Sequence, residues 1–159
     1  FLNGESLGKK SPDSDRVSTH LKQPPFTYEI DEFESGSLRA VGYIDGEVVA
    51  EMERSTPGEP STIQLEYDRS GRDLTAGQND VVFVYASVVD ENGTVVPDAE
   101  PEVHFEVEGD GELIGYNPIK AEAGIATILL RAGDSIGTIT VQAFSDGLLS
   151  AKLEIDVKE

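Results

Sequence analysis

The chain has 159 residues, with 12 Lys and Arg against 31 Asp and Glu, a formal net charge of −19, and no cysteine or tryptophan. This length allows one ordinary domain or two small ones, and it is too short for a complete (β/α)8 barrel, which needs about 250 residues. The negative charge makes nucleic acid and anionic membrane surfaces poor partners. The lack of cysteine excludes disulfides, thiolate metal sites and a cysteine nucleophile.

The first residues predict a strand that ends in a tight turn. Asn3 and Gly4 are the residue types that a type I′ hairpin needs at its two positive-φ positions. The chain begins with Phe1 rather than Met, without a signal peptide, and no apolar run approaches the roughly 20 residues of a membrane span. We therefore expect a piece of a longer protein and no membrane insertion.

Period-two alternation of apolar and polar residues dominates the rest of the chain, which favours strands over helices. Val103, Phe105 and Val107, for example, alternate with His104, Glu106 and Glu108. Val81–Val89 is apolar throughout and suits a strand that is central in its sheet or covered on both sides. In chain order, strands are predicted at 26–31, 38–44, 47–53, 62–67, 80–90, 102–108, 113–115, 124–131, 137–145 and 150–157.

Turn residues and a proline-rich connector organise these strands. Asp45-Gly46 and Asn92-Gly93 predict tight turns, and Thr56-Pro57-Gly58-Glu59-Pro60 predicts a short, stiff connector. Residues 58–159 have the size and strand number of one complete immunoglobulin-like sandwich. Residues 1–57 hold too few strands for one, so we expect the C-terminal part of a sandwich truncated at its N-terminus. The predicted class is all-β, with antiparallel immunoglobulin-like sandwiches.

No catalytic group is predicted. Glu106 and Glu108 would lie on one strand face beside His104, but a solvated face of an amphipathic strand accounts for them. The only other imidazole, His20, lies in the other unit, so a paired histidine site is not expected.

No metal site and no cofactor are predicted either. Asp90-Glu91-Asn92-Gly93 resembles the start of a calcium loop, but a twelve-residue loop would need Glu at the position of Pro101. Asp13 and Asp15 lie in a polar loop that could collect a weak ion, and turn formation explains them as well.

Sugar binding is weighed separately, because carbohydrate sites stack sugar rings on exposed aromatic side chains and this chain lacks tryptophan. Tyr43 and Tyr85 lie in apolar strands, where a core or sheet-face role is expected. Tyr116, in the loop Gly115-Tyr116-Asn117-Pro118, is the candidate ligand-binding residue.

Several stretches resemble, in order and spacing, the C-terminal β-sandwich region of bacterial family 2 glycoside hydrolases, the β-galactosidase-like enzymes. Phe1–Lys10 is similar to that family's "LFLNGKSLG" hairpin, and Gly36–Tyr43 is similar to its "G-x-L-x-A-V-G-Y" strand. Further matching stretches are 56–65, 80–86, 88–97, 109–115 and 122–126.

The resemblance implies that both catalytic glutamates lie on a barrel domain outside this chain. It implies a non-catalytic accessory role, packing against or extending that barrel, with glycan contact open, and a periplasmic or cell-surface location. An immunoglobulin-like module of a cell-surface protein, binding glycan or protein, is the alternative. Because the first unit lacks strands, we expect an exposed sheet edge there, which a second chain could cover in a homodimer.

Overall fold

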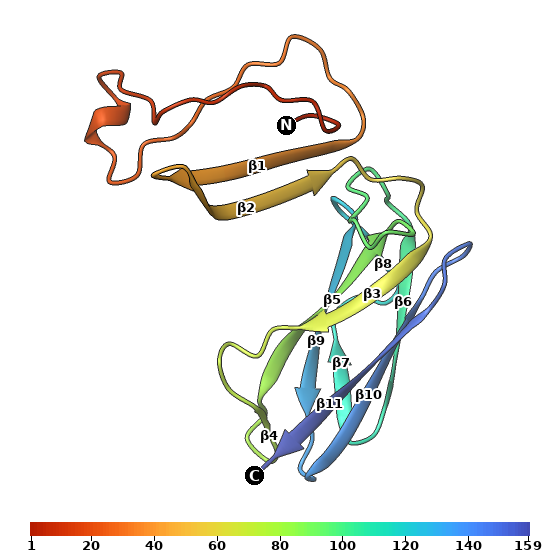
Figure 1. Ribbon diagram of the computed structural model, residues 1–159. Helices are drawn as coiled ribbons and strands as arrows, with labels where there is room; N and C mark the ends of the chain where they lie inside the picture. The colour runs from red at the N-terminus through yellow and green to blue at the C-terminus, as the bar shows by residue number, and fades with distance from the viewer. The chain divides into compact units, whose positions relative to one another are not determined.

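The structure, a computed structural model, describes residues 1–159 and is built almost entirely of strands (Figure 1). It divides into two compact units, Phe1–Thr56 and Pro57–Glu159, called here the N-terminal and C-terminal units. The only helical segment is a short 3-10 turn, η1 (Ser18–His20). The predicted all-β class is confirmed.

The N-terminal unit is centred on an antiparallel hairpin of β1 (Ser37–Ile44) and β2 (Glu47–Ser55). Asp45 and Gly46 form its turn with φ of 52° and 87°, the left-handed pair that a type I′ turn requires. A bulge interrupts the register between Gly42 and Tyr43. Both strands were predicted, to within two residues.

The first residues form a tight turn of their own beside β1. Asn3 and Gly4 have φ of 50° and 85°, as predicted, and Leu2 pairs with both Glu5 and Leu38. The side chain of Asn3 has a role that the sequence did not suggest: its Oδ1 accepts the Ser37 N–H at 2.9 Å. This turn is therefore held to the start of β1 by side chain as well as backbone.

The strand predicted at 26–31 is wrong. Its alternation is real, but Phe26 and Ile30 are exposed, and no neighbouring strand pairs with the segment. The Thr27 carbonyl instead accepts a hydrogen bond from Lys10 Nζ at 2.7 Å. An alternating pattern favours extended backbone, but a strand also needs a partner for its ladder.

The C-terminal unit is a sandwich of two sheets. One has the order β4-β11-β10-β6-β8 and the other β3-β5-β9-β7. Nearly all neighbours are antiparallel, and only β4 runs parallel to β11. The strands are β3 (Thr62–Tyr67), β4 (Leu74–Thr75), β5 (Val81–Val89), β6 (Glu102–Glu108), β7 (Gly111–Ile114), β8 (Ile119–Lys120), β9 (Ile125–Ala132), β10 (Gly137–Phe144) and β11 (Ala151–Lys158).

The two-residue strands β4 and β8 were not predicted, because two residues are too few to show a period. The seven longer strands of this unit were all predicted, with bounds that differ by two residues at most. These seven form the two layers, and β4 and β8 only extend the edges of one sheet.

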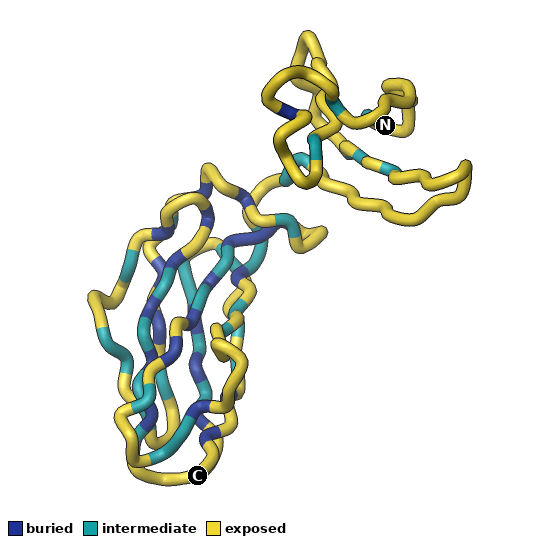
Figure 2. Tube along the Cα trace, turned by 90° about the vertical axis from the view of Figure 1, so that its left-hand side faces the viewer, coloured by how far each residue is buried: buried dark blue, intermediate teal, exposed yellow.

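The core of this unit fills the space between the sheets, as the buried positions along the strands in Figure 2 show. Every second residue of β5, β6, β9, β10 and β11 contributes, because successive side chains of a strand point to opposite faces. Fully buried examples are Val84, Val103, Leu130, Ile139 and Ile155. The alternation of apolar and polar residues alone thus predicted which face of each strand points into the core.

The strand β5 is central in its sheet, between β3 and β9, as its apolar run predicted. Only one of its faces is covered, however. Val82, Val84 and Ala86 are buried, whereas Val81 and Phe83 are exposed on the outer face.

Two bends pack together at one end of the sandwich. The N–H of Gly133 donates to the Asp110 carbonyl at 2.8 Å, and the N–H of Ser135 donates to Asp110 Oδ2 at 2.8 Å. A Cβ at Gly133 would lie 2.1 Å from Asp110 Oδ1. A side chain at Gly133 would therefore displace the Asp110 carboxylate, and the φ of Gly133 itself lies outside the left-handed region.

Substituting Gly133→Ala should lower the free energy of unfolding by about 1–3 kcal/mol, because the new methyl group displaces the Asp110 carboxylate. Gly58→Ala is the matched control, since a Cβ there meets Asp90 only at ordinary contact distances of 3.6 Å and more. We expect its effect to stay within about 0.5 kcal/mol. Urea denaturation measures both, and equal stabilities for the two variants would contradict the close packing.

Candidate functional site

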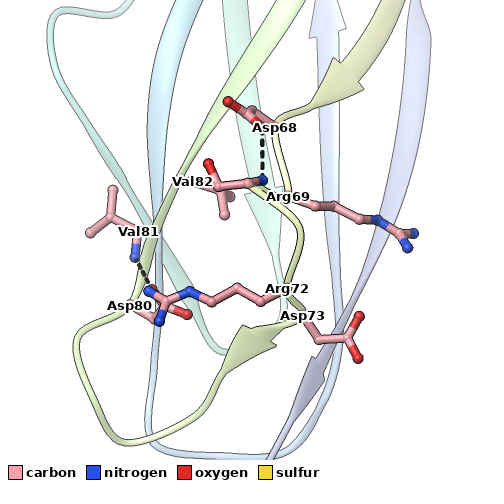
Figure 3. A pocket seen from close by; sticks show the side chains of 8 residues that line it. Asp68, Arg69, Arg72, Asp73, Asp80, Val81 and Val82 are labelled. Atoms are coloured by element: carbon pink, nitrogen blue, oxygen red, sulfur yellow. Dashed lines mark hydrogen bonds and ion pairs between the residues drawn. The ribbon is translucent and has the colours of Figure 1, made fainter.

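A small hollow with a volume of about 80 Å³ lies in the C-terminal unit, between the 68–73 loop and the start of β5 (Figure 3). Arg69 and Asp73 line its rim, and their side chains extend away from it in this view. A space of this size admits a few water molecules, not a sugar ring.

Asp80, one of the charged residues that line this hollow, is bound by other groups of the protein. Asp80 Oδ1 pairs with Arg72 Nη2 at 3.1 Å and accepts the Val81 N–H at 3.1 Å. Its Oδ2 accepts the Thr75 N–H, also at 3.1 Å. Asp80 therefore fixes the loop before β5, and the hollow has the chemistry of a loop anchor.

The acidic strand face around His104 is a solvated surface, as expected. His104, Glu106 and Glu108 are all exposed on β6. The His104 ring stacks on Phe144, with ring centroids 5.2 Å apart and planes at 7°. His104 thus faces an aromatic neighbour across the ladder, and the two glutamates lie opposite Gln142 and Thr140.

Asp90 is the most fully buried charged side chain, with 2% of its surface exposed. Its Oδ2 accepts the Gly58 N–H at 2.8 Å, and its Oδ1 accepts the N–H groups of Asn92 and Thr94 at 2.9 and 2.8 Å. The hydrogen bond from Gly58, followed by that from Thr94, lowers the pKa of this carboxyl below its ordinary value.

The segment that begins at Asp90 and resembles a calcium loop is thus a turn held by the Asp90 carboxylate. Its two oxygens accept N–H donors, so the carboxylate is oriented toward the backbone of its own turn. It also holds Gly58, and with it the connector segment that precedes β3. The sequence did not suggest this second role, because Gly58 and Asp90 are 32 residues apart.

The carboxylate of Asp15, in the polar loop that could collect a weak ion, likewise organises a turn. Asp15 Oδ1 accepts the Val17 N–H at 2.8 Å, its Oδ2 accepts the Ser18 hydroxyl, and these bonds, that of the Ser18 hydroxyl first, lower its pKa. The structure contains no group of three or more His, Cys, Asp or Glu side chains placed to hold a metal ion. It also contains no helix of the length and apolarity that a membrane span requires.

Tyr116, the candidate ligand-binding residue, has a ring that is 90% exposed. The loop that carries it is anchored by the next residue: Asn117 Oδ1 accepts the Phe105 N–H at 2.9 Å, and Asn117 Nδ2 donates to the Phe105 carbonyl at 2.7 Å. An exposed ring on a pinned loop fits the expectation from the sequence. Binding by Tyr116 stays a prediction.

A second aromatic surface was not singled out from the sequence. Phe83 is 48% exposed on the outer face of β5, and the half-buried Tyr85 lies beside it. Their ring centroids are 6.1 Å apart and their planes differ by 14°. Because Val81–Val89 is apolar throughout, the pattern could not show that one of its faces stays open.

Together, the fold and these surfaces define an immunoglobulin-like β-sandwich module. Asp90 and Asp15 organise turns in the chain, and Glu106 and Glu108 are exposed to solvent. The family model described as glycoside hydrolase family 2 C-terminal domain 5 matches residues 63–154, more than half of the chain. A model described as a domain of unknown function, DUF4982, matches residues 1–50. The chain belongs to the family 2 glycoside hydrolases, as a C-terminal domain of that family, which confirms the resemblance noted in its sequence.

Curated relatives are similar over nearly the whole chain. A β-galactosidase of Bacteroides ovatus is 34% identical over 100% of this chain and 19% of its own length. A β-galactosidase of Thermoanaerobacter pseudethanolicus is 35% identical over 91% of this chain and 20% of its own length. The chain therefore spans about a fifth of the length of these relatives.

A solved structure likewise matches this chain with only a small part of its own length. A glycosyl hydrolase family 2 member from Bacteroides cellulosilyticus superposes with a TM-score of 0.77 at 29% identity. The match covers 100% of this chain and 21% of that one.

The Asp90 turn predicts a pH dependence of stability. The folded pKa of Asp90 is lowered, so its carboxylate stabilises the fold above the unfolded pKa of about 3.9, and this contribution is lost as the pH falls through the lower folded value. Asp90→Asn should lower the thermal midpoint at pH 7 and should lose less stability than the wild type between pH 5 and pH 3.

The matched control is Asp146→Asn, because Asp146 is exposed in the turn before β11. Its pH profile should follow that of the wild type in differential scanning calorimetry. Identical profiles for Asp90→Asn and the wild type would show that this carboxylate does not carry the acid dependence.

Proposed function

We propose that this chain is a non-catalytic accessory part of a larger, β-galactosidase-like family 2 glycoside hydrolase, and that it packs against or extends the catalytic barrel. The observation that carries the proposal is the match along the whole chain to only about a fifth of the relatives' length. Both relatives are β-galactosidases, which supports β-galactosides as the substrate class of the parent enzyme.

The chemistry of the acidic groups supports the non-catalytic part of the proposal. A retaining glycosidase needs two carboxyl groups about 5–5.5 Å apart, one of them with a raised pKa so that it can act as an acid. The pKa of Asp90, the buried carboxyl group of this chain, is lowered, which is the opposite of the shift that a general acid needs. Glu106 and Glu108 are exposed on an open strand face.

The proposal includes a periplasmic or cell-surface location of the parent enzyme, which rests on the resemblance alone. It also includes pairing between chains. In the N-terminal unit β2 has β1 on one side only, and all nine of its residues are exposed. Such an edge presents free N–H and C=O groups to a second strand.

Purified 159-residue protein should not hydrolyse p-nitrophenyl β-D-galactopyranoside above the rate of a buffer blank, because the proposal places both catalytic carboxylates on the barrel of the parent enzyme. A continuous absorbance assay at pH 5–8 measures this. Any hydrolysis that persists after a further chromatography step and is lost with Glu106→Gln would overturn the non-catalytic assignment.

The exposed edge of β2 predicts a reversible dimer at high protein concentration. Size-exclusion chromatography with light scattering should show a mass that rises with concentration, and Val49→Pro should suppress the rise, since proline removes an N–H and blocks strand pairing. A constant monomer mass at every concentration would rule out pairing through this edge.

A further inference from the structure

The outer face of the sheet β3-β5-β9-β7 carries an aromatic surface that the proposed function does not use. It is called here the outer aromatic face and consists of Phe83, Tyr85, Ile114 and Leu129. Pairing places Phe83 opposite Leu129, and Leu129 opposite Ile114, so three apolar side chains lie in a row across β5, β9 and β7. These strands lie side by side in Figure 1.

The burial of the row differs along its length. Phe83 is the most exposed member, and Tyr85, Ile114 and Leu129 are half-buried among their neighbours. The rings of Phe83 and Tyr85 are nearly parallel, with planes 14° apart and centroids at 6.1 Å. The pair places two aromatic side chains side by side on one sheet face, whereas Tyr116 is a single ring on a loop.

Hydrogen-bonding groups surround the ring pair at fixed register positions. Tyr85 lies between Glu66 on β3 and Thr127 on β9, and both of these side chains point to the outer face with it. Directly opposed side chains of this kind lie about 4.5–5.5 Å apart at Cβ. Glu66 is exposed and has no ion-pair partner, so its carboxylate can accept hydrogen bonds from a ligand.

We propose that the outer aromatic face binds a neutral oligosaccharide, with Phe83 and Tyr85 as stacking platform and Glu66 and Thr127 as hydrogen-bonding partners. Sugar rings present C–H groups on their flat faces and hydroxyls around the rim. The C–H groups pack on the electron-rich faces of aromatic rings, and the hydroxyls donate to carboxylates. The outer aromatic face combines the two kinds of group that such a ligand needs.

The negative charge of Glu66 distinguishes between a neutral sugar, a uronic acid and a protein as the ligand of this face. The chain carries −19, and Glu66 stands unpaired at the ring pair, so a uronic acid would meet repulsion where a neutral sugar donates a hydroxyl. A protein surface that covered the same face would have to supply a cation for the carboxylate of Glu66, because burying it unpaired carries a large desolvation cost. Both comparisons favour the neutral saccharide.

The proposal adds a ligand-binding site to the accessory role, but its test is separate. The probe is β-1,4-linked galactotetraose, added to the 159-residue protein and followed by NMR at the ring resonances of Phe83 and Tyr85. We expect saturable shifts with a dissociation constant of about 1 mM. A hyaluronan tetrasaccharide, which carries glucuronate, should bind at least about tenfold more weakly.

Leucine variants separate ring stacking from burial, because leucine keeps the apolar bulk of the face. Phe83→Leu and Tyr85→Leu should each weaken galactotetraose binding by about tenfold. Phe33→Leu, at an exposed phenylalanine of the N-terminal unit, is the matched control and should change it by less than about twofold. Far-UV circular dichroism establishes that each variant is folded. The titration of the wild-type protein tests binding even if a variant fails to fold.

The alternative outcomes are distinct. Absence of saturable shifts in the wild type overturns the proposal, as does equal binding of the uronate probe. Loss of binding with Tyr116→Leu but not with Phe83→Leu overturns it in favour of the β7–β8 loop. Self-association that Phe83→Leu abolishes, without sugar binding, overturns it in favour of a protein contact. None of these results bears on whether the chain hydrolyses a galactoside.

Discussion

The packing of two sheet faces against each other is the constraint on which the C-terminal unit depends. Each of the long strands supplies every second side chain to one apolar layer, and Val84, Leu130, Ile139 and Ile155 are fully buried there. Burying side chains of this size contributes about 1.5–3 kcal/mol each. Every other feature of the unit, from the bends to the outer faces, is positioned by this layer.

Short polar anchors fix the ends of the sandwich. Asp90 holds its own turn and Gly58, Asp110 holds the bend at Gly133, and Asn117 holds the loop of Tyr116 to β6. In each case the side chain forms hydrogen bonds with backbone groups. Asp90 and Asp110 therefore organise turns, whereas Glu106 and Glu108 are exposed on a strand face and Glu100 and Glu112 form ion pairs.

The N-terminal unit is built on a different principle. Its hairpin pairs well, yet β2 is exposed along its whole length, and a two-stranded hairpin alone is only marginally stable in water. Side chains such as Met52 and Val48 are open to solvent on it. The unit thus leaves apolar side chains of its hairpin exposed to solvent.

Sequence patterns determined the class, the core sides and most strand bounds, because alternation is a local property that follows from the two-residue period of a strand. The turns at Asn3-Gly4 and Asp45-Gly46 were determined in the same way, by residues that tolerate positive φ. Tertiary structure alone decided the rest. The segment 26–31 alternates like a strand but finds no partner, and β5 is apolar on both faces although only one is covered. Pairing and coverage depend on residues far away in the chain, so no local pattern reveals them. The outer aromatic face and the bond between Asp90 and Gly58 became visible only once the sheets were assembled.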